Sequence, residues 1–227
     1  MTMARIYAHR GASAELPENT LAAFARAVEL GAFGIELDVH LSVDGVPVVI
    51  HDDTVDRTTN GSGAVAEMTA ADLQSLDAGS GEPVPTLEQV LDLVAGKTHL
   101  NIEIKAGEAG DAVLSLISRY PDLHVAISSF NHDALRHVRN TSADIELWPL
   151  TAAISDAVIA TALEIGAPQI NAFDRMLNEE IMREVAAKGL GVWVWTVNDV
   201  GRAKELTGFG AVGICTDDPA TMIAELD

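Results

Sequence analysis

The chain has 227 residues, of which 48% are hydrophobic, and it carries 34 acidic side chains against 14 basic ones, for a formal charge of −20. This length suits one large domain or two small ones with a substantial core, and the apolar fraction excludes a disordered chain. The charge excludes nonspecific binding to nucleic acid or to an anionic membrane, because both are polyanions. A single cysteine, Cys215, rules out an intrachain disulfide. No signal peptide or bilayer-spanning run is evident, so we expect a cytoplasmic protein.

Apolar runs of strand length alternate with longer amphipathic stretches along the chain. In chain order, the expected strands are Arg5–Ala8, Gly34–Leu41 with Val46–Ile50 as its continuation, Leu100–Ile104, Val125–Ser128, Glu146–Trp148, Gln169–Asn171, Gly191–Trp195 and Val212–Cys215. The expected helices are 21–30, 86–95, 111–120, 132–139, 155–166, 178–188, 199–206 and 219–226. A stretch at about 52–84 fits neither period and contains glycine-rich turns, which predicts a small inserted segment.

Eight strand-then-helix units in a chain of this length predict an α/β fold of the TIM (β/α)8 barrel type, with the small insertion after the second strand. We expect residues 1–227 to form one such domain. A doubly wound open sheet is the alternative architecture. It is less favoured because no glycine-rich phosphate fingerprint follows the first strand.

Unusual polar residues gather where the expected strands end. They are His9, Arg10, Glu36, Asp38, His51, Glu103, Lys105 and Trp195. In a parallel barrel the carboxyl ends of all strands share one face, and active sites are built there. We therefore expect these sequence-distant residues to converge.

Three of these residues, Glu36, Asp38 and Glu103, form a candidate metal site. Residues two apart on a strand point to the same face, so Glu36 and Asp38 project together. Three converging carboxylates would repel one another unless a cation neutralised them. Oxygen-only ligands favour one divalent Mg²⁺ or Ca²⁺ ion over Zn²⁺. The alternative is that the carboxylates form ordinary salt bridges with Lys105 and nearby arginines.

His9 and His51 are the candidate general acid and base, because each stands beside other charged groups at the same strand ends. His40 follows Asp38 by two residues and carries less weight. The remaining histidines are expected to have surface or capping roles; they are His99, His124, His132 and His137.

Arg10 and Lys105 would complete a phosphate-binding set. Strand alternation places the Arg10 side chain opposite His9 unless a bulge at Gly11 redirects it. The alternative role for Arg10 is an ion pair with Asp52 or Asp53.

Together these motifs resemble the glycerophosphodiester phosphodiesterase (GDPD) family. The resemblance covers essentially the whole chain in the family's order. It is carried by the motifs at 9–11, 17–20, 34–39, 48–52, 56–63, 85–87, 101–105, 194–198 and 216–219.

The resemblance implies a metal-dependent barrel hydrolase that cleaves glycerophosphodiesters to glycerol 3-phosphate and an alcohol. It assigns metal binding to Glu36, Asp38 and Glu103, and catalysis to His9 and His51. It associates Arg10 and Lys105 with phosphate, and it places Trp195 at the pocket wall. The nucleophile is either water or a neighbouring hydroxyl of the substrate.

Two other functions are consistent with parts of this pattern. A lysophospholipase D-like or phospholipase C-like barrel enzyme would need apolar surface for an acyl chain. The insertion offers only Val65, Met68, Leu73 and Leu76, which we interpret as its own small core. A non-catalytic module that binds glycerophosphodiesters is less favoured, because such a module would be expected to lose a histidine or a metal carboxylate. Cys215 is interpreted as a buried structural thiol.

The charge of −20 conflicts with an anionic substrate unless the local field at the site differs from the global one. A divalent ion, together with Arg10 and Lys105, would supply that local positive charge. We therefore expect a small-molecule phosphodiester as the partner and a pocket that repels it without the metal.

Overall fold

The structure is a computed structural model that describes residues 4–226. The strands are β1 (Arg5–His9), β2 (Gly34–Leu41), β3 (Pro47–Val49), β4 (His99–Ile104), β5 (His124–Ser129), β6 (Glu146–Thr151), β7 (Gln169–Phe173), β8 (Gly191–Trp195) and β9 (Gly213–Thr216). The α-helices are α1 (Leu21–Glu29), α2 (Ala70–Gln74), α3 (Leu87–Val94), α4 (Ala109–Ile117), α5 (His132–Thr141), α6 (Asp156–Glu164), α7 (Glu179–Ala186), α8 (Val200–Gly208) and α9 (Pro219–Leu226). Short 3₁₀ turns lie at Val65–Glu67 and Asp174–Met176.

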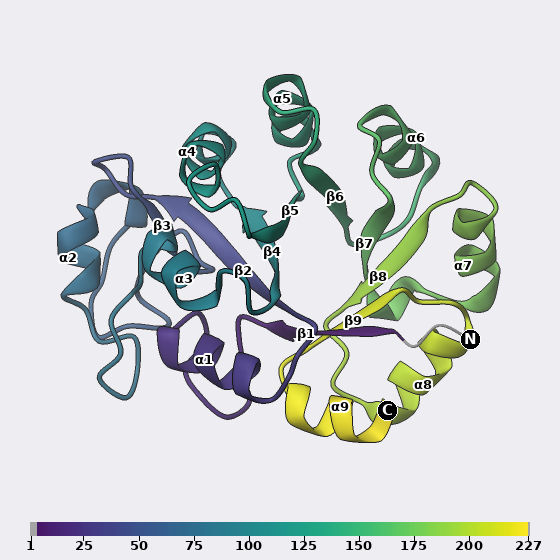
Figure 1. Ribbon diagram of the computed structural model, residues 1–227, viewed down its shortest axis with the longest axis horizontal. Coiled ribbons are helices and arrows are strands. Elements are labelled where there is room, and N and C mark those ends of the chain that lie inside the picture. The colour runs from purple at the N-terminus through teal and green to yellow at the C-terminus, as the bar shows by residue number, and fades with distance from the viewer. Residues whose placement is uncertain (1–3, 227) are drawn as a thin grey trace.

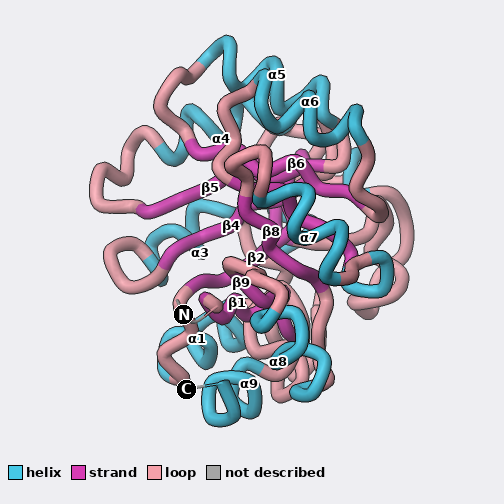
Figure 2. The backbone as a smooth tube through the Cα atoms, turned by 90° about the vertical axis from the view of Figure 1, so that its right-hand side faces the viewer, coloured by secondary structure: helices cyan, strands magenta, loops and turns pink. Residues whose placement is uncertain are grey.

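Eight parallel strands close into a barrel in the order β1-β9-β8-β7-β6-β5-β4-β2, because β1 also pairs with β2. The helices surround this barrel, with α1, α8 and α9 on the side of β1 and β9 (Figures 1 and 2). The prediction of a TIM barrel is therefore confirmed, and the open doubly wound sheet is wrong.

The third strand differs from the prediction that Val46–Ile50 continues the second strand. The chain reverses at Asp44-Gly45, where Gly45 has a φ of 77°, and the amide of Ser42 donates to the carbonyl of Val46. As a result β3 runs antiparallel to β2, outside the barrel. The hairpin returns the chain to the barrel rim, where the amide of Ile50 donates to the carbonyl of Asp38.

Strand alternation separates the aliphatic residues from the polar ones. On β2, Ile35, Leu37 and Val39 pack in the core between strands and helices, and Glu36 and Asp38 lie on the opposite, inner face. Both sets are buried, because helices cover the outer face and barrel closure covers the inner face. The same alternation holds on β4.

Side-chain caps explain where several helices begin. The Thr20 hydroxyl accepts a hydrogen bond from the amide of Ala23 at the start of α1. Thr86 and Gln89 form a reciprocal capping box at the start of α3. These caps fix the loops that lead from the strand ends back to the helical layer.

The inserted segment has its own apolar cluster. Val65 and Leu73 are buried within it, and Met68 and Leu76 pack against it. The cluster also contains Val48 on β3, so the segment is attached to the hairpin at the barrel rim. The four residues that we interpret as the insertion's own core therefore do pack together.

The amino-terminal end of the barrel is closed by aromatic side chains. His99 stacks on Trp148 with ring centroids 5.6 Å apart, and its ring lies edge-on to Tyr7. The prediction of a surface or capping role for His99 is therefore wrong, since its strand begins inside this aromatic cluster. Burial, with the charge of Arg5 adding to it, lowers the pKa of His99 to about 4. None of the helices in residues 4–226 has both the length and the apolar composition to cross a bilayer.

Candidate active site

The register of three strands places four site residues beside one another. His9 on β1 is the direct neighbour of Glu36 on β2, and Asp38 on β2 is the direct neighbour of Glu103 on β4. Because their side chains share the inner face at the carboxyl ends of the strands, they meet inside the barrel. The expected convergence of these residues is thus a direct result of barrel register.

Glu36, Asp38 and Glu103 form a buried cluster in which one oxygen from each lies within 4.8 Å of the others. Lys105 places its Nζ 3.0 Å from Asp38 Oδ1 and 2.8 Å from Glu103 Oε1. Arg10 lies beside the same cluster, with Nε 3.3 Å from Asp38 Oδ2. The cluster is therefore in contact with two cationic side chains.

The three carboxyl groups respond differently to this environment. Burial and the neighbouring carboxylates raise the pKa of Glu36 well above its usual value, and burial with the charge of Asp38 raises the pKa of Glu103 to about 7. Burial acts in the same direction on Asp38, but Lys105 and Arg10 outweigh it and lower the pKa of that group to about 2. Lys105 and Arg10 thus outweigh the effect of burial on the pKa of Asp38, but not on the pKa values of Glu36 and Glu103.

This donor set fits a hard divalent cation. All three side chains offer carboxylate oxygens, they come from neighbouring strands, and the pKa values of Glu36 and Glu103 are raised by burial and by the adjacent carboxylates, an effect that a bound cation would oppose. Mg²⁺ and Ca²⁺ prefer such oxygen ligands. The alternative of ordinary salt bridges accounts for the contacts of Lys105, but within residues 4–226 it leaves Glu36 without a lysine or arginine side chain in contact; Oε2 of Glu36 accepts the backbone amide of Arg10 at 3.2 Å.

His9 is oriented by a carboxylate from the far end of the chain. Its Nδ1 lies 2.6 Å from Asp217 Oδ1, and its Nε2 lies 4.0 Å from Glu36 Oε2. Asp217 also accepts hydrogen bonds from the Ser13 hydroxyl and the Asn198 amide. Burial acts to raise the pKa of Asp217, but these hydrogen bonds and the His9 ring lower it to about 2. With Nδ1 engaged, Nε2 of His9 is the nitrogen available on the metal-site side.

His51 has an equivalent arrangement. Its Nδ1 lies 2.6 Å from Asp52 Oδ1, and Asp52 is held in turn by Arg57. Burial lowers the pKa of His51, while Asp38 and Asp52 act in the opposite direction. His40 lies behind it, with Nε2 3.1 Å from the carbonyl of His51. His40 therefore lies near the site, as its position suggested, but it contacts the backbone of His51.

The side chain of Arg10 reaches the site because the backbone leaves the strand there. Arg10 has a φ of 58° and Gly11 a φ of 85°. A Cβ atom at Gly11 would lie 2.7 Å from the carbonyl carbon of Ala23, so this left-handed turn against α1 requires glycine. The guanidinium then contacts Asp38 and Glu18. Strand alternation alone therefore places the Arg10 side chain wrongly. The alternative ion pair with Asp52 or Asp53 is not formed, because Arg10 contacts Glu18 and Asp38.

Aromatic side chains form the other wall of the pocket. Trp195 packs edge-on against Phe130 and is tilted against Phe173, with ring centroids 5.5 Å and 5.2 Å apart. One pocket of about 90 Å³ is lined by most of the predicted site residues, namely His9, Arg10, Glu36, His51, Glu103, Lys105 and Trp195. Its floor contains Cys215, which burial holds in the thiol form by raising its pKa. The pocket is thus charged on one side and apolar on the other.

Several functional candidates escaped the sequence reasoning. The sequence alone does not pair Asp217 or Asp52 with a histidine, although Asp217 follows a strand end and Asp52 follows His51. Asn101 lies two residues before Glu103 on the same strand face, lines the pocket and has a buried Oδ1 without a partner in residues 4–226. Period-two alternation would have found Asn101. The contacts of Glu18 and Arg57 could not be inferred from spacing.

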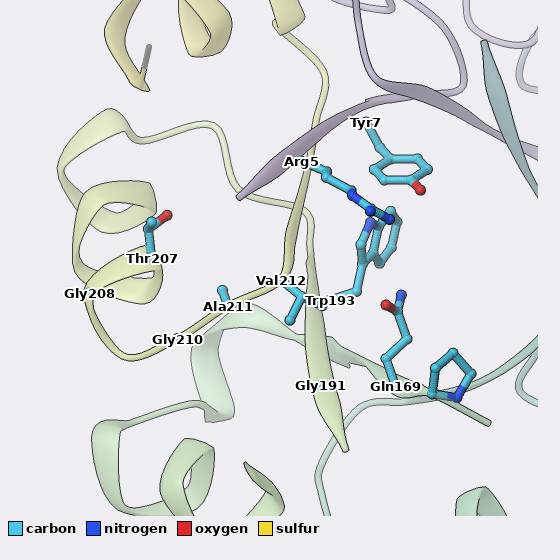
Figure 3. Close-up of a pocket in the computed structure, with 11 residues that line it drawn as sticks. Arg5, Tyr7, Gln169, Gly191, Trp193, Thr207, Gly208, Gly210, Ala211 and Val212 are labelled. Atoms are coloured by element: carbon cyan, nitrogen blue, oxygen red, sulfur yellow. The ribbon is translucent and has the colours of Figure 1, made fainter. Parts of the chain in front are cut away.

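A second pocket, of about 520 Å³, opens at the amino-terminal end of the barrel and is lined by residues including Arg5, Gln169 and Trp193 (Figure 3). Neither a carboxylate nor a histidine lines it. Its titratable side chains are Arg5 and Tyr7, and burial raises the pKa of Tyr7, so neither exchanges a proton readily near neutral pH. The smaller pocket at the carboxyl ends is therefore the candidate active site.

Comparisons with known proteins identify the family of this chain. The model of the glycerophosphoryl diester phosphodiesterase family matches residues 9–221. A glycerophosphodiester phosphodiesterase of Caldanaerobacter subterraneus subsp. tengcongensis is 40% identical over 232 residues, which cover 96% of each chain.

Solved structures give the same result. A phosphodiesterase of Oleispira antarctica, in complex with the product sn-glycerol-3-phosphate, is similar with a TM-score of 0.95 and 30% identity, over 99% of this chain and 97% of that one. A glycerophosphodiester phosphodiesterase of Thermotoga maritima has a TM-score of 0.85 at 29% identity, over 99% of both chains. The chain belongs to the glycerophosphoryl diester phosphodiesterase family, and so to the phosphoric diester hydrolases.

Proposed function

We propose that this protein hydrolyses glycerophosphodiesters to glycerol 3-phosphate and an alcohol, with a divalent cation and with His9 and His51 as general acid and base. The observation that carries the proposal is that Glu36 and Glu103, which form a buried carboxylate cluster with Asp38, line the same pocket as His9 and His51. The relative from Oleispira antarctica, solved with sn-glycerol-3-phosphate as its product, supports the identity of the product.

Glu36, Asp38 and Glu103 would hold one Mg²⁺ or Ca²⁺ ion. When bound, the ion supplies positive charge that orients a phosphate oxygen and stabilises the charge that develops there. Such a site also accounts for how an acidic protein accepts an anionic substrate, because the local charge at the pocket becomes less negative.

Arg10 and Lys105 bind the phosphate group in this proposal. Both line the pocket, and each is held beside the carboxylate cluster by Asp38. Burial acts to lower the pKa of Lys105, but Asp38 and Glu103 outweigh it and raise the pKa, so the ammonium stays protonated. The two side chains therefore present fixed positive charge where a phosphate oxygen is bound.

The two histidines move the protons. One neutral imidazole takes the proton of the attacking hydroxyl, which belongs to water or to the neighbouring hydroxyl of the glycerol group. A new O–P bond forms while the O–P bond to the alcohol breaks, and the other, protonated imidazole gives its proton to the departing oxygen. When water attacks, this step gives glycerol 3-phosphate directly. When the glycerol hydroxyl attacks, it gives a cyclic phosphate, which water then opens to glycerol 3-phosphate with the two imidazoles in exchanged roles. Asp217 and Asp52 hold the Nδ1 atoms, so the exchange takes place at Nε2 of each ring.

The pocket favours a small alcohol over a lipid. Val65 and Leu73, which would be needed to take an acyl chain, are buried within the inserted segment's own cluster. We therefore propose a water-soluble substrate. From the sequence we also propose a cytoplasmic location.

The test measures glycerol 3-phosphate released from glycerophosphocholine. In parallel it measures choline and phosphocholine released from lysophosphatidylcholine, and both reactions are followed after chelation and after addition of each metal. We expect turnover of glycerophosphocholine that requires Mg²⁺ or Ca²⁺. Preferential turnover of lysophosphatidylcholine would favour a lipid-directed enzyme, and binding without any turnover would favour a non-catalytic module.

A further inference from the structure

Arg57, in the inserted segment, makes two paired contacts with carboxylates from different parts of the chain. Its Nη1 and Nη2 lie 2.9 Å and 2.8 Å from the two oxygens of Glu18. Its Nε and Nη2 lie 2.7 Å and 3.0 Å from the two oxygens of Asp52. All three guanidinium nitrogens are therefore engaged, in the planar fork geometry that only arginine offers.

Each of the two carboxylates has a second partner in the candidate active site. Asp52 contacts Nδ1 of His51 at 2.6 Å. Glu18 accepts a hydrogen bond of 2.8 Å from Nη1 of Arg10. A continuous series of contacts thus runs from His51 through Asp52, Arg57 and Glu18 to Arg10.

Arg57 itself does not line the pocket that holds His51 and Arg10. It belongs to the inserted segment, whereas Glu18 lies in the loop between β1 and α1, 39 residues earlier. The loop and the inserted segment reach the same rim of the barrel from different elements. Arg57 is the side chain that contacts both carboxylates, so it fixes their distance from one another.

We propose that Arg57 is a positioning residue that sets the orientation of His51 through Asp52 and that of Arg10 through Glu18. This inference rests on the proposed function, because it assigns proton exchange to His51 and phosphate binding to Arg10. It gives the inserted segment a role in catalysis: the segment aligns the acid–base group with the phosphate-binding group.

The charges along the series are consistent with this role. Hydrogen bonds from Arg57 are the largest influence that lowers the pKa of Asp52, and they also lower that of Glu18 against the effect of burial. Both carboxylates therefore remain ionised as acceptors for His51 and Arg10. The Arg57 side chain is 48% exposed, and exposed ion pairs contribute little to folding stability. Loss of Arg57 should therefore reduce activity far more than stability.

The first experiment replaces Arg57 by Gln and measures kcat and KM for release of glycerol 3-phosphate from glycerophosphocholine. Arg136→Gln is the matched control, since Arg136 also contacts two carboxylates, Glu164 and Asp133, but on α5 and α6. We expect Arg57→Gln to lower kcat about tenfold to a hundredfold and to raise KM, because small displacements of catalytic groups have effects of that size. Arg136→Gln should leave both constants within about twofold, as expected for an exposed ion pair.

Double variants separate positioning from a general structural effect. If Arg57 acts through Asp52 and Glu18, Arg57→Gln should change kcat less than about threefold in an Asp52→Asn background, and KM less than about threefold in a Glu18→Gln background. Effects that are as large in these backgrounds as in the wild type would overturn the proposal. An Arg57→Gln variant with unchanged kcat and KM would do so too.

Arg57→Lys covers the case in which Arg57→Gln fails to fold, which its thermal melting curve reports. Lysine keeps the charge but cannot form two paired contacts. We therefore expect the kcat of Arg57→Lys to lie below that of the wild type and, where Arg57→Gln can be measured, above that of Arg57→Gln. Wild-type kcat and KM in Arg57→Lys would contradict the role of the paired guanidinium contacts. The wild-type assay distinguishes the two hypotheses: without release of glycerol 3-phosphate by the wild type, the proposed function itself fails.

Discussion

His9 and Asp217 are in contact at 2.6 Å although 208 positions separate them in the chain. The contact exists because β1 and β9 are neighbours in the barrel, so that the end of the first strand meets the residue that follows the last one. The carboxylate fixes which imidazole nitrogen carries the hydrogen and which one faces Glu36.

Asp217→Asn should therefore reduce kcat while leaving the fold intact. Asparagine can direct its amide hydrogens at Nδ1 and favour the wrong tautomer, so we expect a loss of about 10- to 1,000-fold. The control is Asp111→Asn, which alters the surface pair between Asp111 and His137 at 2.9 Å. Steady-state kinetics of both variants provide the measurement, and equal kcat values for them would refute the orienting role.

His9→Ala and His51→Ala should each reduce kcat by about two to four orders of magnitude, the usual contribution of a general acid or base. Because the two histidines act in the same step of the proposed reaction, the double variant should lose little more activity than the less active single variant. Single-turnover assays check this without interference from product release. A variant that retained normal turnover would remove that histidine from the mechanism.

Chelation should abolish turnover, and Mg²⁺ or Ca²⁺ should restore it. Glu36→Gln and Glu103→Gln should each lower the affinity for the metal ion, since each removes one of the three proposed carboxylate ligands. Isothermal titration of the metal-free protein with each ion measures this independently of activity. Full activity of a metal-free preparation, or unchanged ion affinity in both variants, would exclude the proposed metal site.

His99 should make stability fall on acidification. Burial, with the charge of Arg5 adding to it, lowers its pKa from 6.5 to about 4, so the unfolded chain binds the extra proton more readily than the folded one in that interval. Its contribution is therefore complete above pH 6.5 and is lost as the pH falls toward 4.

His99→Phe keeps an aromatic ring on Trp148 without a titrating group. Between pH 7 and pH 4.5 it should lose about 1–3 kcal/mol less free energy of unfolding than the wild type. Urea unfolding at a series of pH values measures the difference, with the exposed His137→Phe as control. If the free energy of unfolding changed equally with pH in His99→Phe and in the wild type, a buried, neutral His99 would be contradicted.

Much of the fold could be predicted because alternating strands and helices have distinct periods. Ile35, Leu37 and Val39 alternate with Glu36 and Asp38, so one eight-residue strand encodes both a core face and a site face. The prediction did not include the β3 hairpin, because the apolar residues on both sides of Asp44-Gly45 resemble one long strand. The turn at Asp44-Gly45 reverses the chain, so the second part pairs back on the first. The position of His99 was missed because its aromatic neighbours come from other strands.

The site could be predicted where residues lie at strand ends, but not where contacts depend on loops. The carboxylate cluster follows from strand register and could be anticipated from Glu-x-Asp spacing. The orientation of Arg10 depends on a left-handed turn at Arg10-Gly11, which strand alternation does not describe. The contacts of Asp217 and Arg57 depend on barrel closure and on the path of the insertion, which local sequence does not determine.

The pairing of β1 with β9 has a consequence for how activity develops during folding. The carboxylates come from β2 and β4, which are hydrogen-bonded neighbours in the barrel, so a partly folded chain can assemble them before the barrel is closed. The contact between His9 and Asp217 forms only when the first and last strands meet. Ion binding and turnover would therefore appear at different stages of refolding. The delay between them would measure how long the barrel takes to close.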